Sequence, residues 1–352
     1  MSFFRKAVDA MQGYAPGLQP SDNLALKLNT NENPYPPSER VLVAIAIESS
    51  RLRLYPDPDS TPFRLAAARL NNVDPDCVIA GNGSDELLTI LCRSVVGPGD
   101  RVYFPSPTYT LYDVLVDIQE GVNCPVDFPD DFSLPQPLFA NPGVLTFVAN
   151  PNSPSGTLLQ PDELARLARS LKGLLVIDEA YVDFAPFNCV PLLRDHPNVV
   201  ILRTLSKSYS LAGLRVGYAL ASPEVVLRLN KVRDSYNLDR LAVAGAAAAL
   251  NDSEYMRANA ARICLTRRTL VDALDKLGFT TLPSHANFVL TAPPPPLNAE
   301  LLFRRLWDRK ILVRYFNLPR LDNFLRITVG SDDQMDLLLD ALAHIQAAAL
   351  GS

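Results

Sequence analysis

The middle of the chain alternates between helix-like and strand-like patterns of apolar residues. A helical spacing of leucine and alanine begins after Pro161, and an unbroken apolar run at 174–177 follows it. A second apolar run occupies 199–203, and Ser222-Pro223 supplies the residue types that begin a further helix. Buried strands that alternate with helices are typical of a parallel sheet with helices on both faces. The pattern therefore predicts a large α/β unit.

After about residue 255 the pattern of apolar residues changes. A long helical segment at about 255–276 is followed by short strand-like runs, with a helix at 299–309 between them. The expected strands are 286–290, 311–314 and 324–329. The segment 331–334, Ser-Asp-Asp-Gln, is a capping box that begins the last helix. This mixture of elements predicts a smaller α+β unit.

Size and composition limit the class of protein. A length of 352 residues exceeds the size at which one hydrophobic core usually keeps growing, so we expect two domains. The net charge of −5 gives no electrostatic reason to expect nucleic acid or an anionic membrane as a partner. Because the N-terminus has no long apolar region and the five scattered cysteines form no CxxC pair, we expect a cytoplasmic protein with reduced thiols and no metal site.

Polar side chains follow the two apolar runs where each expected strand ends. Asp178 and Tyr181 follow the first run, and Ser206, Lys207 and Arg215 follow the second. Open α/β sheets bind ligands at this edge. The set suits pyridoxal phosphate, because the amine can form a Schiff base and move a proton, and the carboxylate can hold the pyridine nitrogen protonated. The guanidinium and the hydroxyl suit the phosphate group.

A second half of a phosphate site is indicated by the segment 81–86, between a strand-like and a helical run. Its glycines let backbone N–H groups approach an anion, and a helix N-terminus favours negative charge. We interpret Gly83, Ser84 and Asp85 as cofactor-binding residues. An ordinary strand-to-helix turn with Ser84 as the N-cap is the alternative interpretation. The segment lacks the third glycine of a dinucleotide-binding motif.

The motifs at 178–181, DEAY, and at 204–215, TLSKSYSLAGLR, resemble those of the class II, fold-type I pyridoxal-phosphate aminotransferases. Within them the chain is most similar to the histidinol-phosphate aminotransferases, from about Tyr14 to Gly330. The resemblance implies a homodimer that interconverts L-histidinol phosphate and 2-oxoglutarate with imidazole-acetol phosphate and L-glutamate. It also implies that residues 1–40 join a small domain at 256–352, beside a large cofactor-binding domain at 41–255.

The resemblance assigns further residues to the cofactor. Tyr109 matches the aromatic residue that stacks on the cofactor ring, and Tyr181 can reach the cofactor's 3-hydroxyl group. The segment Asn150–Gly156 resembles the family's NPNNPTG loop, whose asparagine binds that hydroxyl group, but Ser153 replaces the second asparagine position. We expect Asn152 to make this contact, with Ser153 as the alternative. Tyr55 matches a tyrosine that reaches the phosphate of the neighbouring subunit, so the two active sites would be shared.

Substrate recognition is also inferred from the resemblance. Arg326 matches the arginine that binds the substrate carboxylate, which glutamate has and histidinol phosphate lacks. Arg314, Tyr14 and Asn33 are then the candidates for binding the substrate phosphate.

The residues themselves leave other functions open. An aromatic-amino-acid aminotransferase and a threonine-phosphate decarboxylase of the same fold would keep every cofactor residue. A cofactor-binding sensor without catalytic activity is the alternative outside the enzymes. The presence of both Lys207 and Asp178 argues against it.

Overall fold

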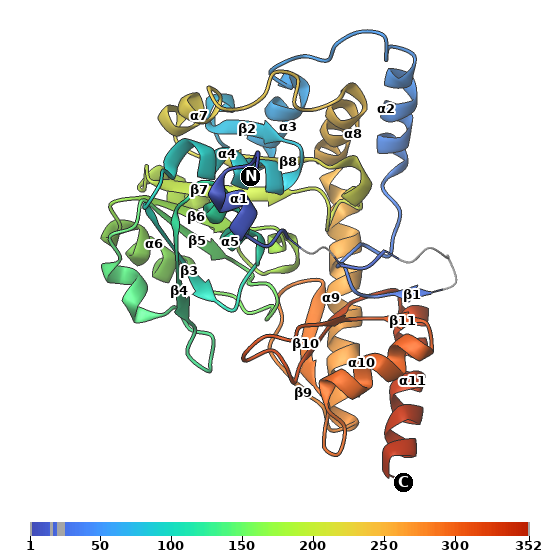
Figure 1. Ribbon diagram of the computed structural model, residues 1–352. Coiled ribbons are helices and arrows are strands. Elements are labelled where there is room, and N and C mark those ends of the chain that lie inside the picture. Colours follow the sequence, from blue (N-terminus) through green and yellow to red (C-terminus); the bar gives the residue numbers. More distant parts are fainter. Residues whose placement is uncertain (1, 15–16, 20–24, 351–352) are drawn as a thin grey trace.

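The fold is built around a large, mostly parallel sheet. The computed structural model describes residues 2–14, 17–19 and 25–350 (Figure 1), and within them the largest sheet has seven strands in the order β2-β8-β7-β6-β5-β3-β4. The strands are β2 (Val78–Gly81), β3 (Arg101–Ser106), β4 (Val122–Asp127), β5 (Leu145–Ala149), β6 (Leu174–Asp178), β7 (Val199–Thr204) and β8 (Gly217–Leu220). Neighbouring strands are parallel except where β8 is one of the pair. This confirms the predicted mostly parallel sheet.

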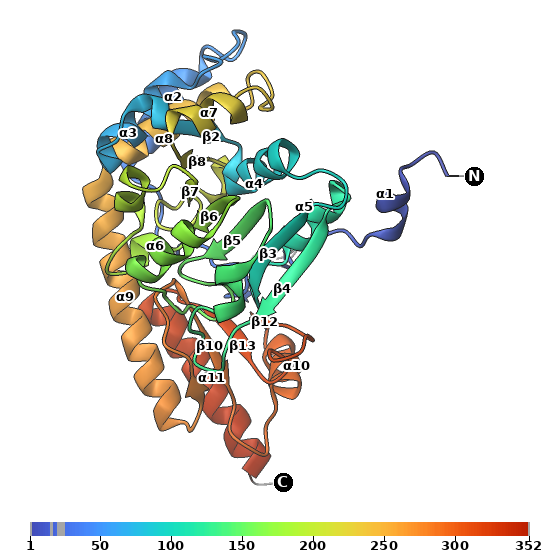
Figure 2. The same ribbon diagram turned by 90° about the vertical axis from the view of Figure 1, so that its left-hand side faces the viewer.

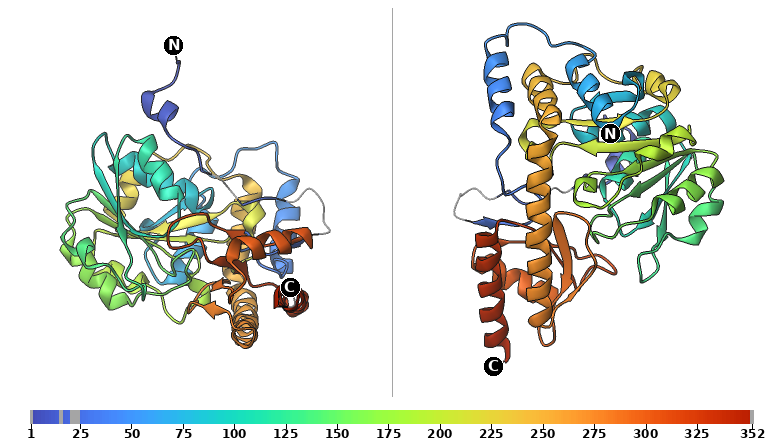
Figure 3. Two further views of the ribbon diagram at one scale, coloured as in Figure 1. Left: turned by 60° about the horizontal axis from the view of Figure 1, so that its bottom comes forward. Right: turned by 180° about the vertical axis from the view of Figure 1, so that it is seen from behind.

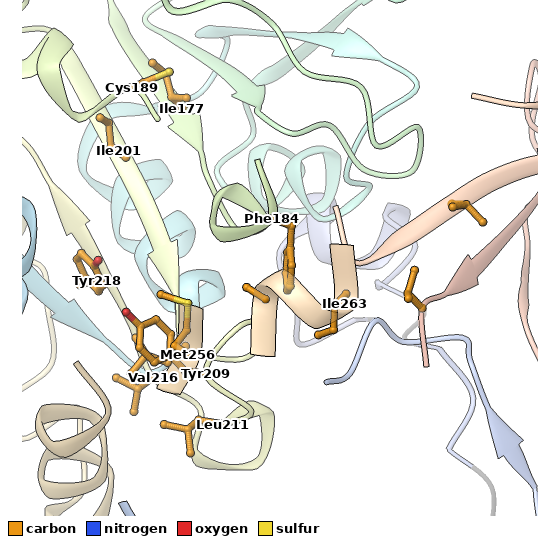
Figure 4. Packing of buried hydrophobic residues seen from close by; sticks show 14 of the residues in the cluster. Ile177, Phe184, Cys189, Ile201, Tyr209, Leu211, Val216, Tyr218, Met256 and Ile263 are labelled. Atoms are coloured by element: carbon orange, nitrogen blue, oxygen red, sulfur yellow. The ribbon is translucent and has the colours of Figure 1, made fainter. Parts of the chain in front are cut away.

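Helices cover both faces of this sheet, as predicted. Successive residues of a strand point to opposite faces, so Ile177 and Ile201 pack in one core whereas Val176 and Val200 pack in the other. Figure 4 shows part of the first core. Helices α3 (Thr61–Asn71), α6 (Pro161–Ser170) and α8 (Arg240–Asn251) contribute to the first core, and α4 (Gly83–Val95), α5 (Leu111–Ile118) and α7 (Pro223–Leu229) to the second. Helix α2 (Glu39–Ser49) packs on α8.

The C-terminal part forms a second, antiparallel sheet in the order β12-β13-β10-β9. The helices and strands of this C-terminal part are α9 (Ser253–Lys276), β9 (Thr280–Thr281), β10 (Phe288–Ala292), α10 (Ala299–Asp308), β11 (Ile311–Leu312), β12 (Arg314–Tyr315), β13 (Leu325–Thr328) and α11 (Asp332–Leu350). The long helix α9 extends alongside both sheets (Figure 3). The capping box is present, because Ser331 Oγ accepts the N–H of Gln334 and Gln334 Oε1 accepts the N–H of Ser331.

One predicted strand, 311–314, is wrong as a single element. In the structure β11 pairs in parallel with β1 (Leu26–Lys27), whereas β12 joins the antiparallel sheet. Two consecutive strands with different partners look like one run in the sequence, because each partner is supplied by a distant segment.

The N-terminal segment contacts two different parts of the chain. Strand β1 lies beside β11, but Arg5, just before α1 (Lys6–Ala10), donates to the carbonyl of Ile118 at 2.8 Å. Helix α1 therefore lies near α5 and projects outward from it (Figure 2). Among the described residues, no helix is both long enough and apolar enough to cross a membrane. All five cysteines are free thiols.

Candidate active site

A cavity of about 620 Å³ lies where the parallel strands of the large sheet end. Its wall includes Ala149, Asp178 and Thr204, which are the last residues of β5, β6 and β7. Arg314 and Arg326 from the antiparallel sheet also line it, so both sheets contribute to one site. The predicted residues that line the cavity are Tyr14, Ser84, Asp85, Tyr109, Asp178, Tyr181, Ser206, Lys207, Arg215, Arg314 and Arg326.

The amine of Lys207 lies in this cavity directly after β7. Its Nζ donates to the carbonyl oxygen of Thr30 at 3.1 Å and lies 5.9 Å from the centre of the Tyr181 ring. The Tyr181 hydroxyl in turn accepts a hydrogen bond from Asn31 Nδ2 at 3.0 Å. The residues 30–31 therefore position both the amine and the phenol.

The carboxylate of Asp178 is buried at the end of β6. Its Oδ2 accepts a hydrogen bond from the Tyr112 hydroxyl at 2.9 Å, and its Oδ1 accepts the N–H of Ala180 at 3.2 Å. Burial raises the pKa of Asp178 to about 6, although the hydrogen bond from Tyr112 lowers it. A protonated pyridine nitrogen of the expected cofactor, placed beside this carboxylate, would favour the ionised form of Asp178. The ionised carboxylate would in turn favour protonation of that nitrogen.

Gly83 and Arg215 lie side by side at the N-terminus of α4, in an arrangement that we call the cradle. Gly83 has φ +78°, a backbone conformation that favours glycine, and a Cβ added to it would lie 2.7 Å from Arg215 Nη2. Arg215 donates to Ser206 Oγ at 3.3 Å and to Asp85 Oδ2 at 3.2 Å. The Tyr109 hydroxyl donates to the other oxygen of Asp85 at 3.2 Å. A guanidinium, a hydroxyl group and a helix N-terminus together suit a phosphate group.

The guanidinium of Arg326 lies at another part of the cavity wall, near two phenylalanine rings. Its Cζ is 5.3 Å from the ring centre of Phe288 and 5.5 Å from that of Phe316. It donates to Ser153 Oγ at 3.3 Å and to the carbonyl oxygen of Asn29 at 2.9 Å, while its buried Nε has no hydrogen-bond acceptor in the described part of the chain. Burial lowers the pKa of Arg326. A carboxylate ligand would offset that burial cost.

The asparagine expected to bind the cofactor does not line the cavity. Asn152 is buried. Its Oδ1 accepts a hydrogen bond from Thr108 Oγ1 of the segment after β3 at 2.8 Å, and its Nδ2 donates to Ser155 Oγ of its own loop at 2.8 Å. Ser153 does line the cavity, and its hydroxyl contacts Arg326. The geometry therefore favours the alternative residue, Ser153, for a contact with a ligand.

Three more predicted residues lie outside the cavity wall, namely Asn33, Tyr55 and Gly83, the last of which packs beside Arg215. Asn33 Nδ2 donates to the carbonyl oxygens of Lys207 at 3.0 Å and Ser208 at 3.1 Å, so it holds the lysine loop and the structure favours that role over a substrate contact. Tyr55 is 79% exposed and stacks on Tyr236, with 4.8 Å between ring centres. Its hydroxyl group is thus not part of the cavity of its own chain.

Tyr112 and Asn31 are site residues that the sequence analysis did not identify. Tyr112 is a fully buried helical residue, and an apolar helix face with a tyrosine gives no indication that its hydroxyl meets a carboxylate. Asn31 has φ +57° and contacts Tyr181 across 150 positions of sequence. Its partner Tyr181 lies in the segment after β6, so no local pattern links the two residues.

The described residues fit pyridoxal phosphate. The cavity wall contains an amine, a buried carboxylate, and a guanidinium with a hydroxyl group beside it, which are the groups that this cofactor's aldehyde, ring nitrogen and phosphate require. Tyr109 offers a ring that is held in place by Tyr112 and Tyr14, with centroid distances of 5.7 Å and 5.8 Å. Fold and site together define an enzyme of the pyridoxal-phosphate-dependent class.

Comparisons with known proteins give the family. The model of the family "Aminotransferase class I and II" matches residues 25–342. The chain is 47% identical over 347 residues to histidinol-phosphate aminotransferase 1 of Nostoc sp., covering 98% of each chain, and 46% identical to histidinol-phosphate aminotransferase of Geotalea daltonii, covering 97% and 99%. The crystal structure of histidinol-phosphate aminotransferase from Sinorhizobium meliloti in complex with pyridoxal-5'-phosphate superposes with a TM-score of 0.90 at 29% identity, covering 99% and 98%. The chain belongs to the class I and II aminotransferases.

Proposed function

We propose that this protein is a pyridoxal-phosphate-dependent histidinol-phosphate aminotransferase of histidine biosynthesis. It would interconvert L-histidinol phosphate and 2-oxoglutarate with imidazole-acetol phosphate and L-glutamate. The observation that carries the proposal is the meeting of Lys207, Asp178 and the Arg215 cradle in one cavity with two further arginines. The names of the relatives at 46–47% identity support this choice of substrate.

The proposed chemistry divides between the cofactor and the chain. When bound, pyridoxal phosphate supplies an aldehyde for the donor's amino group and a ring that withdraws electrons. Arg215, Ser206 and the α4 N-terminus would hold its phosphate, and Asp178 would keep a proton on the ring nitrogen. Lys207 Nζ would move the proton from the donor's α-carbon to the cofactor carbon that carries the amino nitrogen, and would reverse this transfer with the acceptor.

Two arginines support a substrate that alternates between a carboxylate and a phosphate. Arg326 would bind the α-carboxylate of glutamate and 2-oxoglutarate through its planar guanidinium. Arg314 lies over the Phe316 ring at 5.4 Å and lines the same cavity as Tyr14, so these two would meet the substrate phosphate. Arg326→Lys should therefore raise KM for glutamate more than KM for histidinol phosphate.

We also propose a homodimer with shared active sites. Helix α2 exposes Leu42, Val43 and Ile47, and the exposed Tyr55 follows on the same segment, so an apolar surface leads to that tyrosine. A neighbouring subunit would bury it. Mixing Tyr55→Phe chains with Lys207→Ala chains should restore activity, because one site of each heterodimer then has both residues. No recovery in isolated heterodimers would mean that Tyr55 does not act across subunits.

The domain division and the cellular location also remain proposals. The pairing of β1 with β11 supports joining the N-terminal segment to residues 256–352 as a small domain. The five free thiols support a cytoplasmic location.

A spectral titration of the purified, cofactor-loaded protein tests the reaction. Glutamate and histidinol phosphate should each convert the visible absorbance of the cofactor bound to Lys207 to that of its amine form. An equal response to phenylalanine would instead indicate a broad aromatic aminotransferase, and carbon dioxide release from threonine phosphate would indicate the decarboxylase. Lys207→Ala should abolish turnover, whereas a sensor would lose only its ligand response.

A further inference from the structure

A series of polar side-chain contacts starts at Glu179, the residue next to Asp178. Glu179 is fully buried, and its Oε2 accepts a hydrogen bond from Arg203 Nε at 2.7 Å. Its Oε1 accepts the backbone N–H of Cys189 at 2.6 Å. Arg203 points to the face of the large sheet opposite to Asp178, because its neighbour Leu202 packs in the same core as Val176 and successive residues of a strand point to opposite faces.

Asp183 connects this pair to the lysine loop. One carboxylate oxygen of Asp183, Oδ1, lies 3.7 Å from Arg203 Nη1, and the other, Oδ2, accepts a hydrogen bond from Ser208 Oγ. Ser208 directly follows Lys207 and is only 2% exposed. We refer to Glu179, Arg203, Asp183 and Ser208 as the tether.

The tether joins the two loops that carry the proposed catalytic groups. Glu179 and Asp183 lie in the segment after β6, which contains Tyr181 and the short 3-10 helix Val182–Phe184, whereas Ser208 lies in the loop after β7. The guanidinium of Arg203 makes a charge-assisted hydrogen bond to Glu179 at 2.7 Å and an ion-pair contact to Asp183 at 3.7 Å, so one side chain links both carboxylates. In a buried network few other arrangements satisfy every group, so the separation of the loops is fixed.

We infer that Asp183 and Ser208 are positioning residues that fix the Lys207 amine relative to the Asp178 carboxylate. Asn33 already holds the Lys207 and Ser208 carbonyl oxygens from the N-terminal segment. The tether holds the same stretch of backbone through the Ser208 side chain, so the backbone at Lys207 is fixed from two directions. The inference deepens the proposed function, because it rests on Lys207 as the catalytic amine.

The test compares Ser208→Ala with Ser210→Ala in the cofactor-loaded protein. Ser210 lies in the same loop, and its buried hydroxyl group has no hydrogen-bond partner among the described residues, so its removal is the matched control. Asp183→Asn and the double variant with Ser208→Ala complete a double-mutant cycle. The measurements are kcat, KM for glutamate, and the pH midpoint at which the visible absorbance of the Lys207-bound cofactor changes.

Ser208→Ala should lower kcat by roughly tenfold, because a small misplacement of a reacting group has a large kinetic effect. KM for glutamate should change less than about twofold, and the pH midpoint of the visible absorbance should move away from that of the wild type. The double variant should lose no more than Asp183→Asn alone, since both changes break one connection. Ser210→Ala should match the wild type.

Two results would overturn the inference. One is a Ser208→Ala protein that matches Ser210→Ala in both kcat and pH midpoint. The other is a double variant whose loss equals the product of the two single losses. A failure of the proposed function can be told apart from these results. In that case the wild-type protein would form no coloured cofactor adduct with Lys207, and this would be seen before any variant is compared.

Discussion

Replacing Tyr112 with phenylalanine should shift the pH dependence of the enzyme toward higher pH. The Tyr112 hydroxyl donates to Asp178 Oδ2 at 2.9 Å, and both side chains are buried. The substitution removes that donor and retains the ring, which stacks on Phe147 with 4.6 Å between ring centres. The packing is therefore preserved, while the ionised form of Asp178 loses a hydrogen bond.

The size of the shift follows from the hydrogen bond. A hydrogen bond to a charged group contributes about 1.5–3 kcal/mol, and one pKa unit corresponds to about 1.4 kcal/mol. Loss of the Tyr112 donor should therefore raise the pKa of Asp178 by about one to two units. Because Asp178 must be ionised to hold the ring proton, activity is lost at low pH and recovered at higher pH.

The assay is the pH profile of kcat/KM for glutamate with saturating cofactor. The acid limb of the Tyr112→Phe profile should lie about one to two pH units above that of the wild type, with a similar plateau. Tyr218→Phe is the control, because it removes another buried hydroxyl group that contacts Asn71 and not Asp178. An acid limb that coincides with the wild type would refute the proposed link between Tyr112 and the ionisation of Asp178.

Three further predictions concern other parts of the site. Burial raises the pKa of Asp178 from 3.8 to about 6, so ionisation of this group destabilises the cofactor-free fold as the pH rises from about 4 to 6. The cofactor-free Asp178→Asn protein should therefore have a free energy of unfolding about 3 kcal/mol above that of the wild type at pH 7. Denaturant titrations should show this difference vanish near pH 4. Gly83→Ala should weaken cofactor binding at least tenfold in a fluorescence titration, because the added Cβ would displace Arg215, and unchanged binding would contradict the cradle. Phe316→Ala should raise KM for glutamate by exposing Arg326 to water, and an unchanged KM would show that the ring does not support that arginine.

The chemistry at the strand ends could be predicted because it is local. Asp178 and Lys207 each follow a continuous apolar run, and residues at the carboxyl ends of adjacent parallel strands must meet at one edge of the sheet. The glycine at position 83 was also predictable, because a strand that turns into a helix around an anion requires close approach of the backbone.

The asparagine assignments show where the sequence was not sufficient. Asn152 and Ser153 are neighbours, and only the loop conformation decides that Asn152 turns toward Ser155 while Ser153 faces the cavity. Asn33 holds the backbone of Lys207 across 174 positions of sequence, which no local pattern can indicate.

The sequence by itself determined the two classes of sheet and the cofactor-type residues, because hydrophobic periodicity and strand ends act over a few neighbouring residues. Only the tertiary structure decided how Tyr112 meets Asp178, how the predicted strand 311–314 divides between two partners, and how Asp183 reaches Ser208. Each of these depends on segments that are distant in the chain and are brought together by burial of the two cores. Side-chain partners in such places are chosen by packing, and packing is a property of the whole fold.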